Sequence, residues 1–507
     1  GSEMCIRDRE KDAGRKERRV GDLFQSCRQC AWNNSGLVRR GSMDKKEYIK
    51  ILTDQIRCKI ARPAVAREIG DHIEDQTRAF VSEGMNQAEA EAAAVKEMGN
   101  PVETGVELDR IHRPKMPWLM IGLIVILSGA SCVFQFLLNQ EAVTAGAGSF
   151  YDSRRQIIFT VLGLLVMIGV CFADYTRIAA RARELLSGLI LIIVLGRMSM
   201  GLTLNGAERW IALPGGLSVD VLLLLMLTVP LYGAVLYGYR GKGWSAIWKG
   251  VLWMVPGCWL ATQCSSVWMA FVLSLTYLVM LGLAAYHGWY RLPGKAVFAG
   301  ICIAAVALPV AAAVLIWLFG ADYQKMRLLF YISPLTGNSG EPQDMISYAM
   351  VYVRGILENS RFVGAADAMA SGVSGMPELS DFMLCSVAGY YGILAAVILA
   401  GVLLFLLLRF LQISIRQRNQ LGMMMGTGCA VVFLIEAGFY FLNNLGIIYL
   451  GNYCPFFSYG GTGTIVTYIL MGILLSICRY QNVAPERKTA GPLFGIRRPA
   501  ERMKEQI

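Results

Sequence analysis

Three short motifs, far apart in the chain, carry the residues whose types could do chemistry. Asp381 lies just before an apolar run, Arg209 and Trp210 stand together in a polar loop, and residues 458–461 read Ser-Tyr-Gly-Gly. A carboxylate near a membrane surface can act as a general base. An arginine can bind phosphate oxygens in bidentate fashion, and glycine lets backbone N–H groups approach a ligand closely. These residues predict a site for an amphiphilic substrate at a membrane surface.

Each of these residues also has a purely structural interpretation. Asp381 could cap the helix that follows it, because aspartate is a preferred N-cap residue. Arg209 and Trp210 could anchor the chain in the interfacial aromatic belt. Gly460 and Gly461 could serve only to let two helices pack closely. The residue types alone leave both sets of interpretations open.

The composition predicts an all-α, polytopic membrane protein. The 507 residues are 55% hydrophobic and 17% charged, with a mean hydropathy of +0.46. Soluble domains are roughly 45–50% apolar and about 25% charged. The polar residues gather in 1–114, and long apolar runs of the roughly 20 residues that span a bilayer fill 115–480. The period-2 alternation of a membrane β-barrel is not visible in these runs.

About ten transmembrane helices fit the apolar runs, with both termini in the cytoplasm. The net charge of +11 is then explained by Lys and Arg in the cytoplasmic connections, as the positive-inside rule requires, rather than by nucleic-acid binding. All three motifs fall on the opposite face. The expected spans lie near 117–138, 156–173, 184–201, 218–238, 246–263, 266–286, 296–319, 382–408, 422–447 and 461–478.

Outside the apolar part, the chain divides into three further segments. Residues 1–42 are polar and without a clean helical period, and we expect a non-native or disordered leader before Met43. Residues 43–114 predict a small cytoplasmic helical domain, which resembles the prefix domain found before some bacterial permeases. Residues 481–507 predict a basic cytoplasmic tail, and the longest outer loop covers 320–381.

Glu436 is the one carboxylate well inside an expected span. Charges inside a membrane are costly and are functional hypotheses by default. The Glu436 carboxyl could be protonated, or paired with Asn443 or Asn444. The 13 cysteines form no metal-type cluster, so we assign neither a zinc site nor a disulfide.

The order of several motifs resembles that of the SEDS family (shape, elongation, division and sporulation), whose members include FtsW, RodA and SpoVE. The resemblance covers about residues 115–480. The matching segments are Arg155-Gln156, Asp174-Tyr175, the loop 205–211 (Asn-Gly-Ala-Glu-Arg-Trp-Ile), Arg327 with Pro334, the stretch 377–382 (Pro-Glu-Leu-Ser-Asp-Phe) and the stretch 455–461 (Pro-Phe-Phe-Ser-Tyr-Gly-Gly).

The resemblance implies polymerisation of lipid II into peptidoglycan glycan strands, in division, elongation or sporulation, at the outer face of a bacterial cytoplasmic membrane. The implied partner is a class B penicillin-binding protein, beside lipid II itself and membrane lipids. Asp381 falls where the family has its catalytic aspartate. Arg209 and Arg327 would then offset charge on the departing undecaprenyl pyrophosphate, with Trp210, Ser458, Tyr459, Gly460 and Gly461 as further substrate-binding candidates. No cofactor is implied with certainty, although a divalent cation could assist the leaving group.

The chain departs from the family at several places, among them the stretch before Asp381, where the family's histidine is absent and the loop is one residue shorter. The family's QPSE is replaced by Asp-Val-Leu-Leu at 220–223, its PDLGT by Cys-Ser-Ser-Val-Trp at 264–268, and its Glu-Glu pair by Gly389-Tyr390. Two alternatives therefore stay open. The chain could be a non-catalytic scaffold for a penicillin-binding protein, or a transporter of lipid-linked precursors, which would need a polar path through the bundle.

Overall fold

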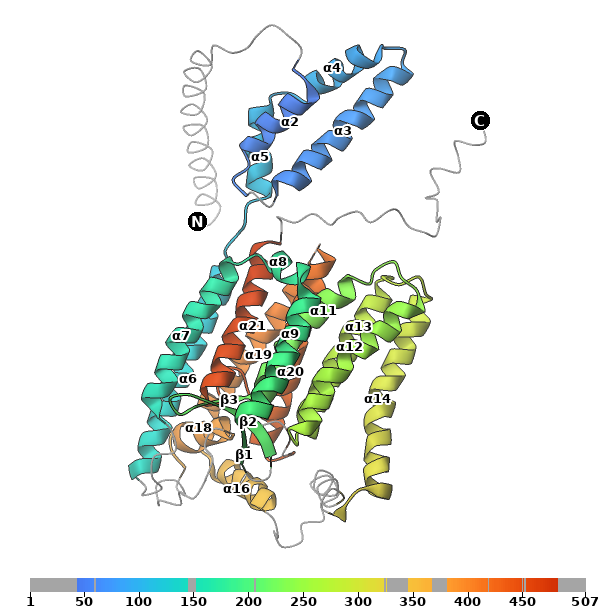
Figure 1. The fold of residues 1–507 in the computed structure, drawn as a ribbon. Coiled ribbons are helices and arrows are strands. Elements are labelled where there is room, and N and C mark those ends of the chain that lie inside the picture. The colour runs from blue at the N-terminus through green and yellow to red at the C-terminus, as the bar shows by residue number, and fades with distance from the viewer. Residues whose placement is uncertain are drawn as a thin grey trace, which may run out of the picture. The chain divides into compact units, whose positions relative to one another are not determined.

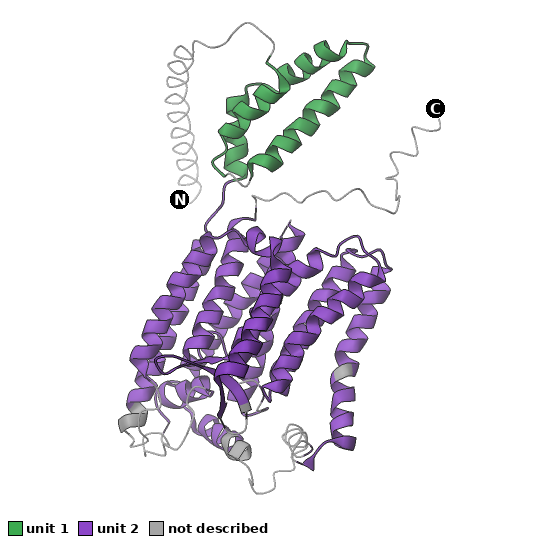
Figure 2. Cartoon of the chain, viewed as in Figure 1, with its two compact units in different colours: residues 1–112 green, residues 113–507 purple. Residues whose placement is uncertain are grey.

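The structure is a computed structural model that describes most of the helical part of the chain. The expected leader 1–42, Arg327, and the motif residues at 205–206 and 377–380 lie outside the described residues. Two compact units, residues 1–112 and residues 113–507, divide the chain (Figure 2). The described residues are 43–58, 61–144, 152–204, 207–322, 325, 345–366, 381–417, 419–448, 450 and 453–481.

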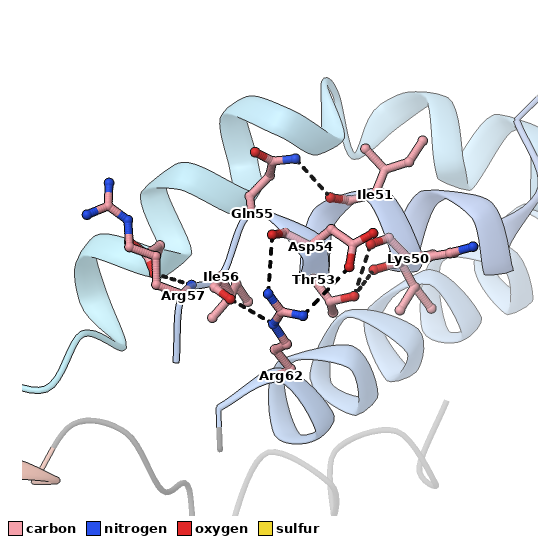
Figure 3. Close-up of polar contacts among 10 residues, drawn as sticks. Lys50, Ile51, Thr53, Asp54, Gln55, Ile56, Arg57 and Arg62 are labelled. Atoms are coloured by element: carbon pink, nitrogen blue, oxygen red, sulfur yellow. Dashed lines mark hydrogen bonds and ion pairs between the residues drawn. The ribbon is translucent and has the colours of Figure 1, made fainter. Parts of the chain in front are cut away.

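In its described residues, the first unit is a small bundle of four helices. Arg62, at the start of α3 (Arg62–Ser82), donates from Nε to the carbonyl oxygen of Ile56 at 2.8 Å (Figure 3). Ile56 lies just past the end of α2 (Lys45–Asp54), so this bond satisfies a carbonyl oxygen at the end of that helix. The backbone N–H of Arg57 donates to Asp109 at 2.7 Å and ties in the last helix. The helices are α2 (Lys45–Asp54), α3 (Arg62–Ser82), α4 (Gln87–Glu97) and α5 (Pro101–Ile111), around the buried residues Tyr48, Leu52, Val65, Ile69, Ile73, Ala90 and Ala94.

The second unit is a bundle of long apolar helices, which Figure 1 shows running alongside one another with α14 at one edge. Small residues bring some of them very close. A Cβ on Gly472 of α21 would lie 2.7 Å from Val170 of α7, so these two helices can pack only with glycine there. The helices are α6 (Trp118–Thr144), α7 (Ser153–Phe172), α8 (Tyr175–Ala180), α9 (Ala182–Met200), α10 (Val221–Leu225), α11 (Thr228–Tyr237), α12 (Trp244–Gln263), α13 (Val267–Tyr286), α14 (Gly294–Phe319), α16 (Met345–Asn359), α18 (Met383–Tyr391), α19 (Ile393–Ile415), α20 (Gln420–Asn444) and α21 (Gly461–Arg479).

The class of helical membrane protein predicted from the sequence is confirmed. Seven helices in the described part of the chain, namely α6, α7, α13, α14, α19, α20 and α21, are long and apolar enough to cross a membrane. Every expected span coincides with a helix or with a broken pair of helices. The break between α10 and α11 and the break at Gly392, between α18 and α19, were not expected. A total of ten crossings stays a prediction.

One element departs from the all-helical expectation. Residues 201–220 form a three-stranded antiparallel sheet, with β1 (Gly201–Leu204), β2 (Ala207–Leu213) and β3 (Leu217–Asp220) in the order β1-β2-β3. Gly215 and Gly216 turn the chain between β2 and β3 with φ of +87° and +74°, a conformation that favours glycine. The sheet shortens the expected span 218–238, whose first helical residue is Val221.

Candidate functional site

Arg209 lies on the central strand of this sheet and is held by Asp220 at the end of β3. Its Nε donates to Asp220 Oδ2 at 2.9 Å and its Nη2 to the same oxygen at 2.5 Å. The other carboxylate oxygen, Oδ1, accepts from the backbone N–H of Leu222 at 2.9 Å and caps α10. One carboxylate thus fixes both the guanidinium and the start of the helix.

The electrostatic environment of Arg209, on the sheet, includes Asp381 from the motif at 377–382. Burial by itself would lower the pKa of the Arg209 guanidinium, but the hydrogen bond and charge of Asp220 and the charge of Asp381 outweigh it and raise that pKa. Arg209 also lies over the ring of Trp210, 5.2 Å from its centroid. Arg209 and Asp381, 172 positions apart in the sequence, therefore belong to one electrostatic site.

Asp381 is half-buried in the turn that precedes α18. The N-cap residue of that helix is Phe382, whose side chain makes no capping hydrogen bond. The structural interpretation of Asp381 as an N-cap is therefore wrong. Its carbonyl oxygen instead accepts from the side-chain amide of Asn444 at the end of α20, at 3.2 Å.

The Ser-Tyr-Gly-Gly stretch is bound to its neighbours within the protein. The hydroxyl of Ser458 accepts from the backbone N–H of Cys454 at 2.8 Å, and that of Tyr459 accepts from the N–H of Asp152 at 3.3 Å. The backbone N–H of Gly460 donates to Gln156 on α7 at 3.2 Å. These contacts use the groups that a ligand would need, and they favour the packing interpretation.

Gly461 strengthens that interpretation. A Cβ at this position would lie 2.7 Å from the ring of Phe159, so the first turn of α21 can approach α7 only with glycine there. At the start of the same turn, the hydroxyl of Thr462 accepts from the backbone N–H of Asp220 at 3.2 Å. Thr462, directly after the stretch, thus holds the end of β3, which carries the partner of Arg209.

Glu436 is buried in α20, with 1% of its surface exposed. Its Oε2 accepts from the indole N–H of Trp268 at 3.4 Å, whereas its Oε1 has no partner among the described residues. The expected pairing with Asn443 or Asn444 is wrong, because Asn444 is bound to α18 and the Asn443 amide has no partner in the described part of the chain. The charge of Arg209 acts on Glu436 as well as on Asp381.

Arg197, a further cation, carried no signal in the sequence. It lies in the last turn of α9 and donates to Glu208 at 3.3 Å and to the carbonyl oxygen of Gln263 at 3.4 Å. Both Arg197 and Arg209 act electrostatically on Cys264, at the end of α12. Within the described ranges, His, Cys, Asp and Glu side chains form no group of three that could hold a metal ion.

With this geometry in place, comparison with known proteins decides the family. The model of the cell cycle protein family that comprises FtsW, RodA and SpoVE matches residues 115–483. The chain belongs to this family. The resemblance read from the motif order is confirmed.

Relatives of the chain are distant but cover most of its membrane unit. A probable peptidoglycan glycosyltransferase FtsW of Alcanivorax borkumensis is 26% identical over 373 residues, which cover 71% of this chain and 91% of the relative. A probable FtsW of Geobacter sulfurreducens is 24% identical over 392 residues, which cover 75% of this chain and 99% of the relative.

A solved structure shares the fold. It is described as the structural coordination of polymerization and crosslinking by a peptidoglycan synthase complex, and it superposes with a TM-score of 0.58 at 20% identity. The match covers 72% of this chain and 98% of the solved one. The membrane unit therefore shares its fold with nearly the whole of that solved chain, and the residues before 113 belong to a separate unit.

The departures from the family motifs lie close to the site. Asp220, the first residue of the segment that replaces the family's QPSE, is the partner of Arg209. Trp268, the last residue of the segment that replaces PDLGT, is the partner of Glu436. Both substituted segments therefore supply side-chain contacts that hold charged residues of this site.

Proposed function

We propose that this protein polymerises lipid II into peptidoglycan glycan strands as an inverting glycosyltransferase. The reaction takes place at the outer surface of a bacterial cytoplasmic membrane, with both chain termini in the cytoplasm. Membership of the FtsW, RodA and SpoVE family supports the reaction, because the curated relatives bear the name peptidoglycan glycosyltransferase. The partner is a class B penicillin-binding protein, in keeping with the shared fold of a peptidoglycan synthase complex.

Asp381 is the general base of this mechanism. Its carboxylate removes the proton from the acceptor sugar hydroxyl, whose oxygen attacks the anomeric carbon of the donor. The glycosidic bond forms as the bond to undecaprenyl pyrophosphate breaks, and negative charge grows on the leaving oxygen. Arg209 offsets that charge, together with Arg327 from the outer loop.

The observation that carries the proposal is that the charge of Asp381 acts on the guanidinium of Arg209. A base and a cation must face the same reaction centre, the base at the acceptor hydroxyl and the cation at the leaving pyrophosphate of the donor. Arg209 lies on β2 and Asp381 in the turn before α18, so segments far apart in the sequence supply the two charges. Trp210 lies against Arg209 and adds an aromatic surface at the same place.

The test is polymerisation of labelled lipid II by the purified full-length protein with its partner. We expect wild type to make glycan ladders and Asp381→Asn to lose them, by a factor of about 100 or more if the base contributes the usual 10²–10⁴. The matched control is Asp322→Asn, because Asp322 is an exposed carboxylate just beyond α14, and it should leave the ladders intact.

The same experiment separates the enzyme from a scaffold. Ladders that persist unchanged in folded Asp381→Asn would refute Asp381 as the base. If folded wild type with its partner makes no ladders, the polymerase proposal fails for this substrate and the scaffold takes its place. The internal engagement of Arg209 by Asp220 is the observation that favours the scaffold, because a guanidinium that is already paired binds pyrophosphate less readily.

A further inference from the structure

The first turn of α18 has backbone N–H groups that the side chain of its N-cap residue does not bind. The N-cap residue is Phe382, which has no side chain able to accept a hydrogen bond, and the first helical residue is Met383. The first N–H groups of a helix have no partner within the helix, and they are costly to bury unsatisfied. Phe382, Met383 and Cys385 are all less than 5% exposed, so water does not meet this need.

The missing acceptors come from another helix. The hydroxyl of Tyr440 on α20 accepts from the N–H of Met383 at 3.2 Å. The Oδ1 atom of Asn444, one turn further along α20, accepts from the N–H of Cys385 at 3.0 Å. Two side chains of a membrane helix thus cap the helix that begins beside Asp381.

Asn444 also binds the backbone of Asp381 directly. Its Nδ2 donates to the carbonyl oxygen of Asp381 at 3.2 Å and to that of Tyr440 at 2.9 Å. The acceptor and both donor directions of this amide are therefore used, in a side chain that is 4% exposed. A fully bonded, buried amide holds the Asp381 peptide in one place.

We infer that Asn444 and Tyr440 are positioning residues for Asp381. Neither needs to touch the substrate. They fix the backbone that follows the proposed base, because the bonds fall on the carbonyl of Asp381 and on the N–H groups of the next turn. This inference rests on the role proposed for Asp381, and it assigns to the end of α20 a task that the motifs of the family do not indicate.

We call Asn444 and Tyr440 the clamp. The contacts between α18 and α16 show what the clamp adds. Phe382 and Cys385 pack in a buried cluster with Met350, Val353 and Ile356 of α16. These contacts are apolar except for the weak donation of the Cys385 thiol to the Val353 carbonyl at 3.8 Å. Apolar packing restrains position loosely, whereas directed hydrogen bonds also fix the orientation of a peptide.

The test compares Asn444→Leu with the neighbouring Asn443→Leu. Asn443 is equally buried, and its amide atoms have no partner in the described part of the chain, so it is a matched control. We expect Asn444→Leu to lower kcat for lipid II polymerisation by about 10- to 100-fold, as small displacements of a reacting group do, with KM unchanged within about twofold. Asn443→Leu should keep both constants near those of wild type.

Tyr440→Phe keeps the ring and removes the hydroxyl that accepts from the Met383 N–H. It should lower kcat by a smaller factor than Asn444→Leu, because the carbonyl of Asp381 remains bound. Equal losses in Asn443→Leu and Asn444→Leu would overturn the inference, since both would then report a general disturbance of the helix end. A kcat within twofold of wild type in folded Asn444→Leu would overturn it as well.

Amide hydrogen exchange supplies a readout that does not depend on activity. Exchange at Met383 and Cys385 should become faster in Asn444→Leu and stay unchanged in Asn443→Leu, because only the first loses the cap on α18. If wild type makes no glycan, the proposed polymerase fails while faster exchange still establishes the clamp. Unchanged exchange in Asn444→Leu refutes the clamp, whatever the activity.

Discussion

Asp220→Asn is the substitution that separates the two tasks of the Asp220 carboxylate. An asparagine can keep Oδ1 as the acceptor for Leu222 and so preserve the cap on α10. Its amide nitrogen would then face the donors of Arg209, where Oδ2 now accepts two hydrogen bonds. The substitution therefore removes the ion pair without removing the helix cap.

The expected cost follows from the exposure of the two partners. Hydrogen bonds to charged groups contribute roughly 1.5–3 kcal/mol, and breaking a fully buried ion pair costs about 3–5 kcal/mol. The Asp220 side chain is 11% exposed and that of Arg209 37% exposed, so solvent screens the pair in part. We expect a loss of about 2 kcal/mol in the free energy of unfolding, or roughly a 30-fold change in the unfolding equilibrium.

The assay is denaturant unfolding of the purified protein in detergent, for Asp220→Asn, Asp220→Ala and Arg209→Gln. Asp220→Ala also deletes the cap and should be about 1 kcal/mol less stable than Asp220→Asn. In the Arg209→Gln background, Asp220→Asn should cost much less than in wild type, because the pair is already broken. A stability of Asp220→Asn within about 0.5 kcal/mol of wild type would refute the reasoning, as would equal costs in both backgrounds.

Two further predictions concern the bundle itself. Gly163→Ala should destabilise the protein by about 1–3 kcal/mol, because its Cβ would overlap the ring of Tyr468 on α21; Gly169→Ala on the same helix, where a Cβ meets nothing within 4 Å, should be neutral or stabilising in the same unfolding assay. Glu436→Gln keeps an acceptor for Trp268 and should retain at least half of the lipid II polymerisation rate. A loss of tenfold or more would instead show that the negative charge of Glu436 takes part in the reaction.

The fold class could be predicted because hydropathy acts over whole helices. A run of some 20 apolar residues has few alternatives to a membrane helix, so the segments that become α6, α19 and α20 are visible in the sequence. The sheet at 201–220 was missed for the opposite reason. Its strands of four to seven residues are short and lie between two apolar helices, and the pairing that defines them is a tertiary contact.

The candidate site was predictable only in part. Asp381 and Arg209 could be found because each lies in a motif, and the structure brings their charges together. Asp220 appeared in the sequence only as a departure from a family motif, and its bond to Arg209 depends on the register that places Trp210 opposite Asp220. Asn444 looked like any asparagine at a helix end, since its three partners lie at 381, 385 and 440.

The balance of charge around Arg209 bears on how the donor is bound. Asp220 already pairs with this guanidinium. The charge of Asp381 also acts on Arg209, and the charge of Arg209 acts on Glu436. A pyrophosphate adds further negative charge, which a single paired arginine offsets poorly at close range. We therefore expect the binding of lipid II to need a second cation at this place. Two sources of this cation are Arg327, on the expected outer loop, and a divalent cation carried in by the pyrophosphate. Replacing Arg327 should raise KM for lipid II strongly if Arg327 is the second cation, and only slightly if a divalent cation is.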